Sequence, residues 1–210
     1  MSARRTARTV ILVLICACIV VGYYTYLDRT TSEKANNSEN VRITEKDRLL
    51  TMDFEKNYPP TPREVIKVYN RYLNLCFGGS KLSSKDIKTL AGKIRQMMDP
   101  KLADANPADD YERSLSQEIK EYTSRKTKMI STDVCDTSDV IYGKLDGSDV
   151  AYVRATYSIK EASSYQRTFQ RFILRMDDKD HWKIVGFELT DADGNPLAQG
   201  HVIKAGEKTK

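Results

Sequence analysis

A continuous apolar stretch near the N-terminus constrains this chain more than any other feature. Residues 9–27, TVILVLICACIVVGYYTYL, contain no charged side chain. A helix of this length spans about 28 Å, which is close to the hydrocarbon thickness of a bilayer. The stretch therefore predicts a transmembrane helix, and the folded domain is expected in the residues that follow it.

The residues on either side of the stretch predict its orientation. Three arginines precede it without any acidic residue: Arg4, Arg5 and Arg8. Because positively charged flanks stay on the cytoplasmic side, residues 1–8 are expected to be cytoplasmic and the rest of the chain extracytoplasmic. Three tyrosines are expected at the outer interface of the membrane, where an aromatic ring with a polar tip is stable: Tyr23, Tyr24 and Tyr26.

A cleaved signal peptide and a lipoprotein signal are the alternatives to a permanent anchor. No A-x-A-like cleavage site follows the apolar core, which argues against cleavage. Cys18 is the candidate lipidated residue, but the apolar run continues past it, whereas a lipoprotein signal would stop there. The favoured interpretation is an uncleaved, single-pass anchor in the cell membrane, bound to lipid through this helix.

The charge balance argues against nucleic acid as a partner. Three of the 34 basic side chains precede the apolar stretch, and the remainder nearly balance the 29 acidic ones. Phosphate backbones are bound by concentrated cationic faces, and no long basic run is present.

The chain beyond the stretch divides into a linker, a domain and a tail. Residues 28–54 are polar without a sustained period and predict a flexible stalk, whose apolar patch at residues 49–54 is expected to dock on the domain. Residues 55–190 carry the periodic patterns of a single folded domain. Residues 191–210 are polar and are expected to fray as a C-terminal tail.

Three helices are expected in the first half of the domain. The first begins with the capping-box pattern of residues 61–64, TPRE, and ends at Gly78. The second begins at residue 83 or 84 and stops at Asp99-Pro100. The third begins with Asn106 as its cap, followed by a proline at the first helical position.

The second half of the domain switches to the alternation that is typical of strands. Signals of β structure cover residues 129–142, 149–161, 165–176 and 181–190, and Asp146-Gly147 predicts a hairpin turn. Helices followed by antiparallel strands predict an α+β domain, with three helices on one face of an about four-stranded sheet. Because the strands are long, the sheet is expected to be curved.

The order of elements and the final strand, HWKIVGFEL at residues 181–189, resemble the NTF2-like (cystatin-like, cone-shaped) superfamily over about residues 55–190. This resemblance implies that the three helices fold into the concavity of the curved sheet, with Trp182 helping to close the cone. Residues 57–65, NYPPTPREV, are similar to the start of uncharacterised, singly membrane-anchored proteins from Gram-positive, clostridial-type bacteria. The superfamily hosts isomerases, dehydratases, transport factors and scaffolds, so the resemblance selects no activity.

No catalytic set, cofactor site or metal site is expected. The two histidines are His181, at a turn, and His201, in the tail, and neither position suits a shielded base. The chain has no G-x-S-x-G, P-loop or G-x-G-x-x-G motif, and no Cys/His cluster for zinc. Asp133 and Asp136 are expected on a solvated strand face. Whether Cys76 and Cys135 pair as a disulfide stays open, because sequence does not give their separation.

These observations favour a membrane-anchored, extracytoplasmic, non-catalytic domain that binds other extracytoplasmic or membrane proteins as an interaction or scaffold module. The first alternative is a small-ligand site inside the cone, with Tyr157, Arg154 and Arg171 as its pocket residues. A cone filled solidly by Tyr69, Tyr72, Ile94 and Tyr122 would argue against that alternative. The second alternative is an isomerase or dehydratase, which requires an inward Asp or Glu with a raised pKa.

Overall fold

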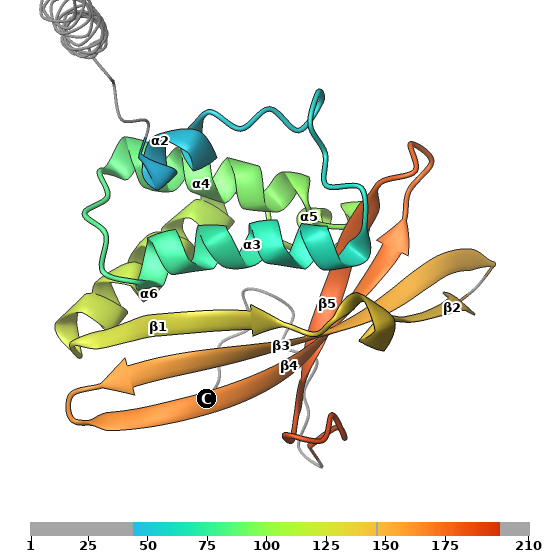
Figure 1. The fold of residues 1–210 in the computed structure, drawn as a ribbon. Helices are drawn as coiled ribbons and strands as arrows, with labels where there is room; N and C mark the ends of the chain where they lie inside the picture. The colour runs from blue at the N-terminus through green and yellow to red at the C-terminus, as the bar shows by residue number, and fades with distance from the viewer. Residues whose placement is uncertain (1–43, 146, 198–210) are drawn as a thin grey trace, which may run out of the picture. The chain divides into compact units, whose positions relative to one another are not determined.

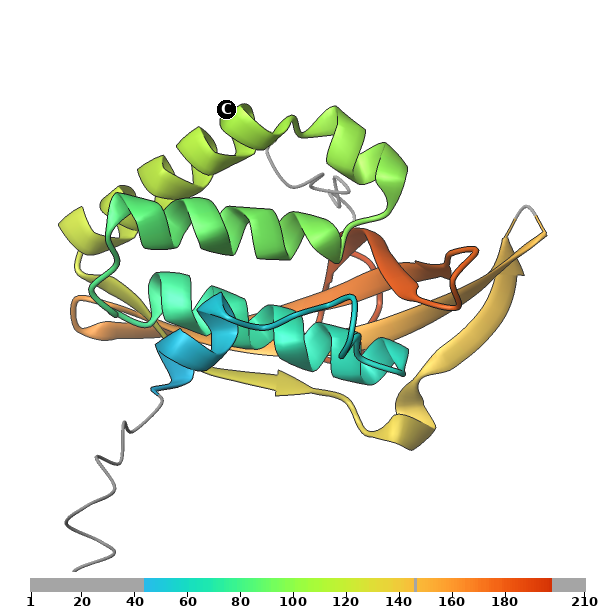
Figure 2. The same cartoon turned by 90° about the horizontal axis from the view of Figure 1, so that it is seen from above.

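The computed structural model describes residues 44–145 and 147–197, and within these ranges helices cover one face of an antiparallel sheet (Figures 1 and 2). The helices are α2 (Glu45–Leu50), α3 (Pro62–Phe77), α4 (Ser84–Gln96), α5 (Pro100–Ala105) and α6 (Ala108–Ser124). The strands are β1 (Thr127–Val134), β2 (Ile141–Leu145), β3 (Ser148–Glu161), β4 (Ser164–Met176) and β5 (Trp182–Thr190), with a 3-10 turn, η1 (Thr137–Asp139), before β2. The predicted α+β class is confirmed.

None of the helices in the described ranges is long and apolar enough to cross a membrane. The predicted span over residues 9–27, its flanking arginines and its three tyrosines lie outside those ranges.

The sheet has five strands rather than about four. The strand order is β1-β3-β4-β5, and β2 pairs with the part of β3 that β1 leaves free. Residues 129–142 were predicted as one strand, but the chain leaves the sheet after Val134 and returns at Ile141, so two short strands share one neighbour. Leu145 pairs with Ser148, as the predicted two-residue hairpin requires.

The start of α3 confirms the predicted cap but not the capping box. The Thr61 hydroxyl accepts a hydrogen bond from the Glu64 N–H at 3.2 Å, and Pro62 occupies the first turn. The Glu64 carboxylate instead pairs with the Lys67 ammonium group at 2.8 Å, one turn further along the helix. Side-chain capping therefore supplies one of the two hydrogen bonds that the pattern predicts.

Helix α5 was not predicted, and its presence changes the role of Asn106. The sequence predicts that a helix stops at Asp99-Pro100, but the Asp99 carboxylate also accepts the Lys101 N–H at 3.0 Å and starts α5. The Asn106 amide donates to the Leu102 carbonyl at 2.8 Å, so this side chain closes α5 instead of capping α6. Helix α6 begins after Pro107 without a side-chain cap.

Both predicted ends of the domain need correction. Leu49 and Phe54 are buried in the core, and the Tyr72 hydroxyl donates to the Leu49 carbonyl at 3.0 Å. The expected docking of residues 49–54 on the domain is therefore confirmed, and the described part of the domain includes residues 44–54, which the sequence assigned to the stalk. At the other end, the Leu197 N–H donates to the Leu189 carbonyl at 3.1 Å, so residues 191–197 fold back on β5 instead of fraying.

The core lies between α3 and α4 on one side and the sheet on the other. Tyr72 of α3, Ile94 of α4 and Phe172 of β4 have no exposed surface. Tyr69 meets Phe172 edge to face, with ring centroids 5.5 Å apart. Full burial of each such side chain contributes on the order of 1.5–3 kcal/mol, so this layer carries most of the stability.

Candidate functional site

The three residues predicted to line a ligand pocket do not come together. Tyr157 points toward the helices, where its hydroxyl donates to the Asn70 side-chain oxygen at 2.7 Å in the core. Arg154 and Arg171 are register partners on β3 and β4, so they share the opposite face of the sheet. Arg171 bonds Glu188 there. Positions 154 and 157 differ by an odd number, which places their side chains on opposite faces of β3, so the three residues do not line one pocket.

The space between the helices and the sheet is filled by the protein's own side chains. Tyr69, Tyr72 and Ile94 are buried, and Tyr122 packs on Phe77 with ring centroids 4.6 Å apart. These are the residues whose packing was expected to decide against a ligand site in this layer. These side chains occupy the layer in which the ligand alternative places its pocket.

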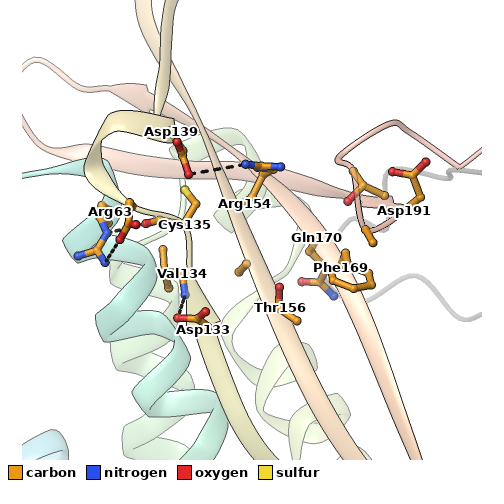
Figure 3. Close-up of a pocket in the computed structure, with 14 residues that line it drawn as sticks. Arg63, Asp133, Val134, Cys135, Asp139, Arg154, Thr156, Phe169, Gln170 and Asp191 are labelled. Atoms are coloured by element: carbon orange, nitrogen blue, oxygen red, sulfur yellow. Dashed lines mark hydrogen bonds and ion pairs between the residues drawn. The ribbon is translucent and has the colours of Figure 1, made fainter.

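A cavity of about 350 Å³ lies at the end of β1 (Figure 3). It is bounded by the end of β1, the η1 turn, the middle of β3 and β4, and the turn that follows β5. The polar and charged side chains that line it are Arg63, Asp133, Cys135, Asp136, Asp139, Arg154, Thr156, Gln170, Thr190 and Asp191. Arg154 is the only member of the predicted pocket set among these lining residues, and both Asp133 and Asp136 are present.

The charged groups of this cavity already have partners within the chain. The Arg63 Nε donates to the Cys135 carbonyl at 2.6 Å, and Arg154 lies 3.8 Å from an Asp139 oxygen (Figure 3). The Asp133 carboxylate accepts the N–H of Val134 at 2.9 Å. The Asp191 carboxylate accepts hydrogen bonds from the turn that it begins. These contacts hold the ends of the strands in place. They leave few charged side chains of the cavity free to bind a ligand.

The two thiols of the described part of the chain are free, so the open question of a Cys76–Cys135 disulfide is answered against pairing in this structure. Burial raises the pKa of Cys76 to about 12. Burial also raises the pKa of Cys135, although the hydrogen bond from the Arg154 backbone acts in the opposite sense. Neither sulfur is activated as a thiolate nucleophile.

Glu118 of α6 comes nearest to the acid that the enzyme alternative requires. Burial raises the pKa of its carboxyl, and the neighbouring Glu121 acts in the same sense. The residue nevertheless remains exposed, and it does not line the cavity in Figure 3. Within residues 44–145 and 147–197, no group of three His, Cys, Asp or Glu side chains is placed to hold a metal ion.

Strand β2 presents apolar side chains to solvent. Ile141 is 61% exposed, Tyr142 57% and Leu145 43%. The strand pairs with β3 on one side, and no described segment pairs with its other side. The β2–β3 hairpin also extends past the N-terminal end of α3 in both ribbon views (Figures 1 and 2). We call residues 141–145 the open edge; sequence patterns missed it, because they merged it with β1.

Comparison with known proteins places the chain in a family whose description names no function. No curated protein matches the chain. Residues 1–187 match the family described as "Domain of unknown function (DUF6715)", and the match includes both the predicted anchor and nearly all of the folded domain. The chain therefore belongs to this family.

Proposed function

We propose that this protein is a non-catalytic interaction module, held outside the cell membrane by a single N-terminal helix over residues 9–27. The observation that carries the proposal is the open edge, where a strand with three exposed apolar side chains has no partner among the described residues. Proteins normally protect such edges, because unpaired backbone groups and apolar side chains attract other chains. An edge left open in this way favours a binding surface.

The proposal includes an NTF2-like fold for the domain. Three features support it: helices precede the strands, they cover one face of the sheet, and Trp182 is buried at the start of the last strand. The filled interior favours a scaffold role of this fold over a ligand-binding one. The free and unactivated thiols, together with the exposed Glu118, favour a non-catalytic role.

The anchor part of the proposal rests on the sequence of residues 9–27 and on the three arginines before it. In the proposed arrangement, Tyr23, Tyr24 and Tyr26 lie at the outer interface, and the polar residues 28–43 separate the membrane from Thr44. Partners are then proteins of the same membrane or of the space outside it.

Photo-crosslinking in native membranes tests the proposal. The full-length chain carries a photoreactive amino acid at Tyr142, and the matched control carries it at Lys120, an exposed position on α6. Adducts identified by mass spectrometry are expected at Tyr142 and not at Lys120. Identical adduct patterns at the two positions would overturn the interaction role. Release of the intact chain from membranes by alkaline extraction would overturn the anchor.

A further inference from the structure

The open edge has a defined hydrogen-bonding pattern. In a two-residue hairpin the flanking residues, here Leu145 and Ser148, form a hydrogen-bonded pair, and bonded positions then alternate along the strand. Ile141 and Gly143 accordingly bond β3, and the backbone groups of Tyr142 and Lys144 point away from the sheet. The backbone N–H and C=O groups of these two residues, one on each side of Gly143, can form hydrogen bonds with one further strand.

The sequence of the open edge, IYGKL, is complementary to itself about Gly143. In an antiparallel pair centred on that residue, Ile141 faces Leu145 of the second strand and Tyr142 faces Lys144. Ile141 already lies in one row with Tyr152 and Ile173, its successive register partners across the sheet. A second copy would extend this apolar row with its own Leu145.

The charges favour the same arrangement. A lysine on an edge strand ordinarily discourages pairing. Here the Lys144 ammonium group is 2.9 Å from a carboxylate oxygen of Asp149 in the same chain, which offsets its charge. In the antiparallel register the two lysines lie on opposite sides of Gly143, and each faces a Tyr142 ring, a favourable cation–π position. A parallel pair would set lysine against lysine.

We infer that the partner of the open edge is a second copy of this chain, joined by antiparallel pairing of β2 with β2 about a two-fold axis at Gly143. The inference rests on the proposed interaction role of this edge. A five-residue strand buries less than the roughly 1,000 Å² of a stable interface, so the pair is weak between chains free in solution. Two chains anchored in one membrane meet at a much higher effective concentration, and the pair forms there.

Disulfide trapping at the axis tests the inference in the full-length chain. A Cβ atom added at Gly143 meets only Val150 Cγ2, at 3.8 Å, so Gly143→Cys fits the strand. In oxidised native membranes, Gly143→Cys is expected to give about tenfold more covalent dimer than Lys120→Cys, because the axis brings the two Cα atoms within disulfide range. The unsubstituted chain, treated in parallel, measures the contribution of the native cysteines.

The register supplies a second, independent readout. Chains with Tyr142→Cys are expected to cross-link to chains with Lys144→Cys, which they face. Neither variant is expected to cross-link to itself, since like positions lie about 8 Å apart, beyond disulfide reach. Circular dichroism of each variant confirms that it is folded.

The outcomes separate this inference from the proposed function. Equal dimer yields at Gly143 and Lys120, or cross-linking of every position to itself, would overturn the two-fold pair. Tyr142 photo-adducts with a different protein would then leave the interaction role standing. Gly143→Cys dimers that persist when alkaline extraction removes the chain from membranes would instead support the pair and overturn the anchor.

Discussion

The strands β5 and β2 both lie at margins of the sheet, but only β5 is covered by other segments among the described residues. Along β5, the Ile184 N–H donates to the Met97 carbonyl and the Asp99 N–H donates to the Ile184 carbonyl, each at 2.8 Å, so the residues after α4 cover one part of the strand. The turn after β5 covers another part through Leu197. Along β2 no described segment does this. Among the described residues, the contrast distinguishes the open edge, which no segment covers, from the β5 margin, which two segments cover.

The largest effect is expected from one substitution made at both margins. Ile184→Ala removes a side chain that is 4% exposed at the covered margin and is expected to cost about 3 kcal/mol of unfolding free energy. Ile141→Ala, at the open edge, is expected to cost less than about 0.5 kcal/mol. Urea unfolding followed by the fluorescence of the single tryptophan, which both variants keep, measures the two changes. Equal costs would contradict the distinction between the margins.

A smaller effect is expected from the turn that covers the end of β5. Gly194 has a φ of +91°, and a Cβ there would lie 3.1 Å from Arg154 Cδ. Gly194→Ala is therefore expected to destabilise the protein by about 1–2 kcal/mol. Gly92→Ala in α4 is the matched control: a Cβ there meets nothing within 4 Å, and alanine is expected to stabilise the helix by up to about 1 kcal/mol. Thermal unfolding that shifts both variants in the same direction would contradict this assignment.

The smallest effect concerns the pH dependence of the covered margin. Burial raises the pKa of Asp177, but the backbone N–H groups of His181 and Lys179 and the charge of Lys183 outweigh it, so the pKa lies below the unfolded value of 3.8. Because the pKa is lower in the folded state, the ionised Asp177 carboxylate stabilises the protein at pH values above the unfolded pKa. This stabilisation is lost as the pH falls through the folded pKa. The stability gap between the wild type and Asp177→Asn is thus expected to shrink from pH 6 to pH 3.

Urea midpoints at the two pH values measure this gap. Asp149→Asn is the matched control at the open edge, where the ion pair with Lys144 is exposed and is expected to contribute little. A gap that grows toward pH 3 would contradict the role given to Asp177.

The parts of the fold that sequence predicted are those set by local signals. Thr61 and Ser83 cap α3 and α4 where their patterns indicate, and the Asp146-Gly147 signal falls at a hairpin. The parts that it missed depend on distant contacts. Asp99 caps α5 locally through the Lys101 N–H, but two distant contacts also hold it in place: its N–H donates to the Ile184 carbonyl of β5, and its carboxylate lies 3.5 Å from Arg175. Neither contact is visible in a window of neighbouring residues.

The candidate site was harder to predict than the fold, for a related reason. Strand alternation alone predicts that Tyr157 and Arg154 lie on opposite faces of β3, and the structure confirms this, but alternation does not indicate which face holds a cavity. The sequence carries no comparable signal for the exposure of Ile141. An apolar residue in a strand is ordinarily expected to be buried, and only the absence of a covering segment in the described structure makes this one a surface residue.

The attachment of α2 has a mechanical consequence. A pull on the chain before Thr44 reaches α2 first, and this helix is tied to α3 by the contact of Glu45 with Arg71 at 2.6 Å and to α4 by the contact of Lys46 with Asp86 at 2.7 Å. The lysine contact also persists in acid, because its hydrogen bond lowers the pKa of Asp86 to about 2. In the proposed anchored arrangement, a pull from the membrane would load these two contacts before it reached the strands, and the open edge would keep its shape for as long as they hold.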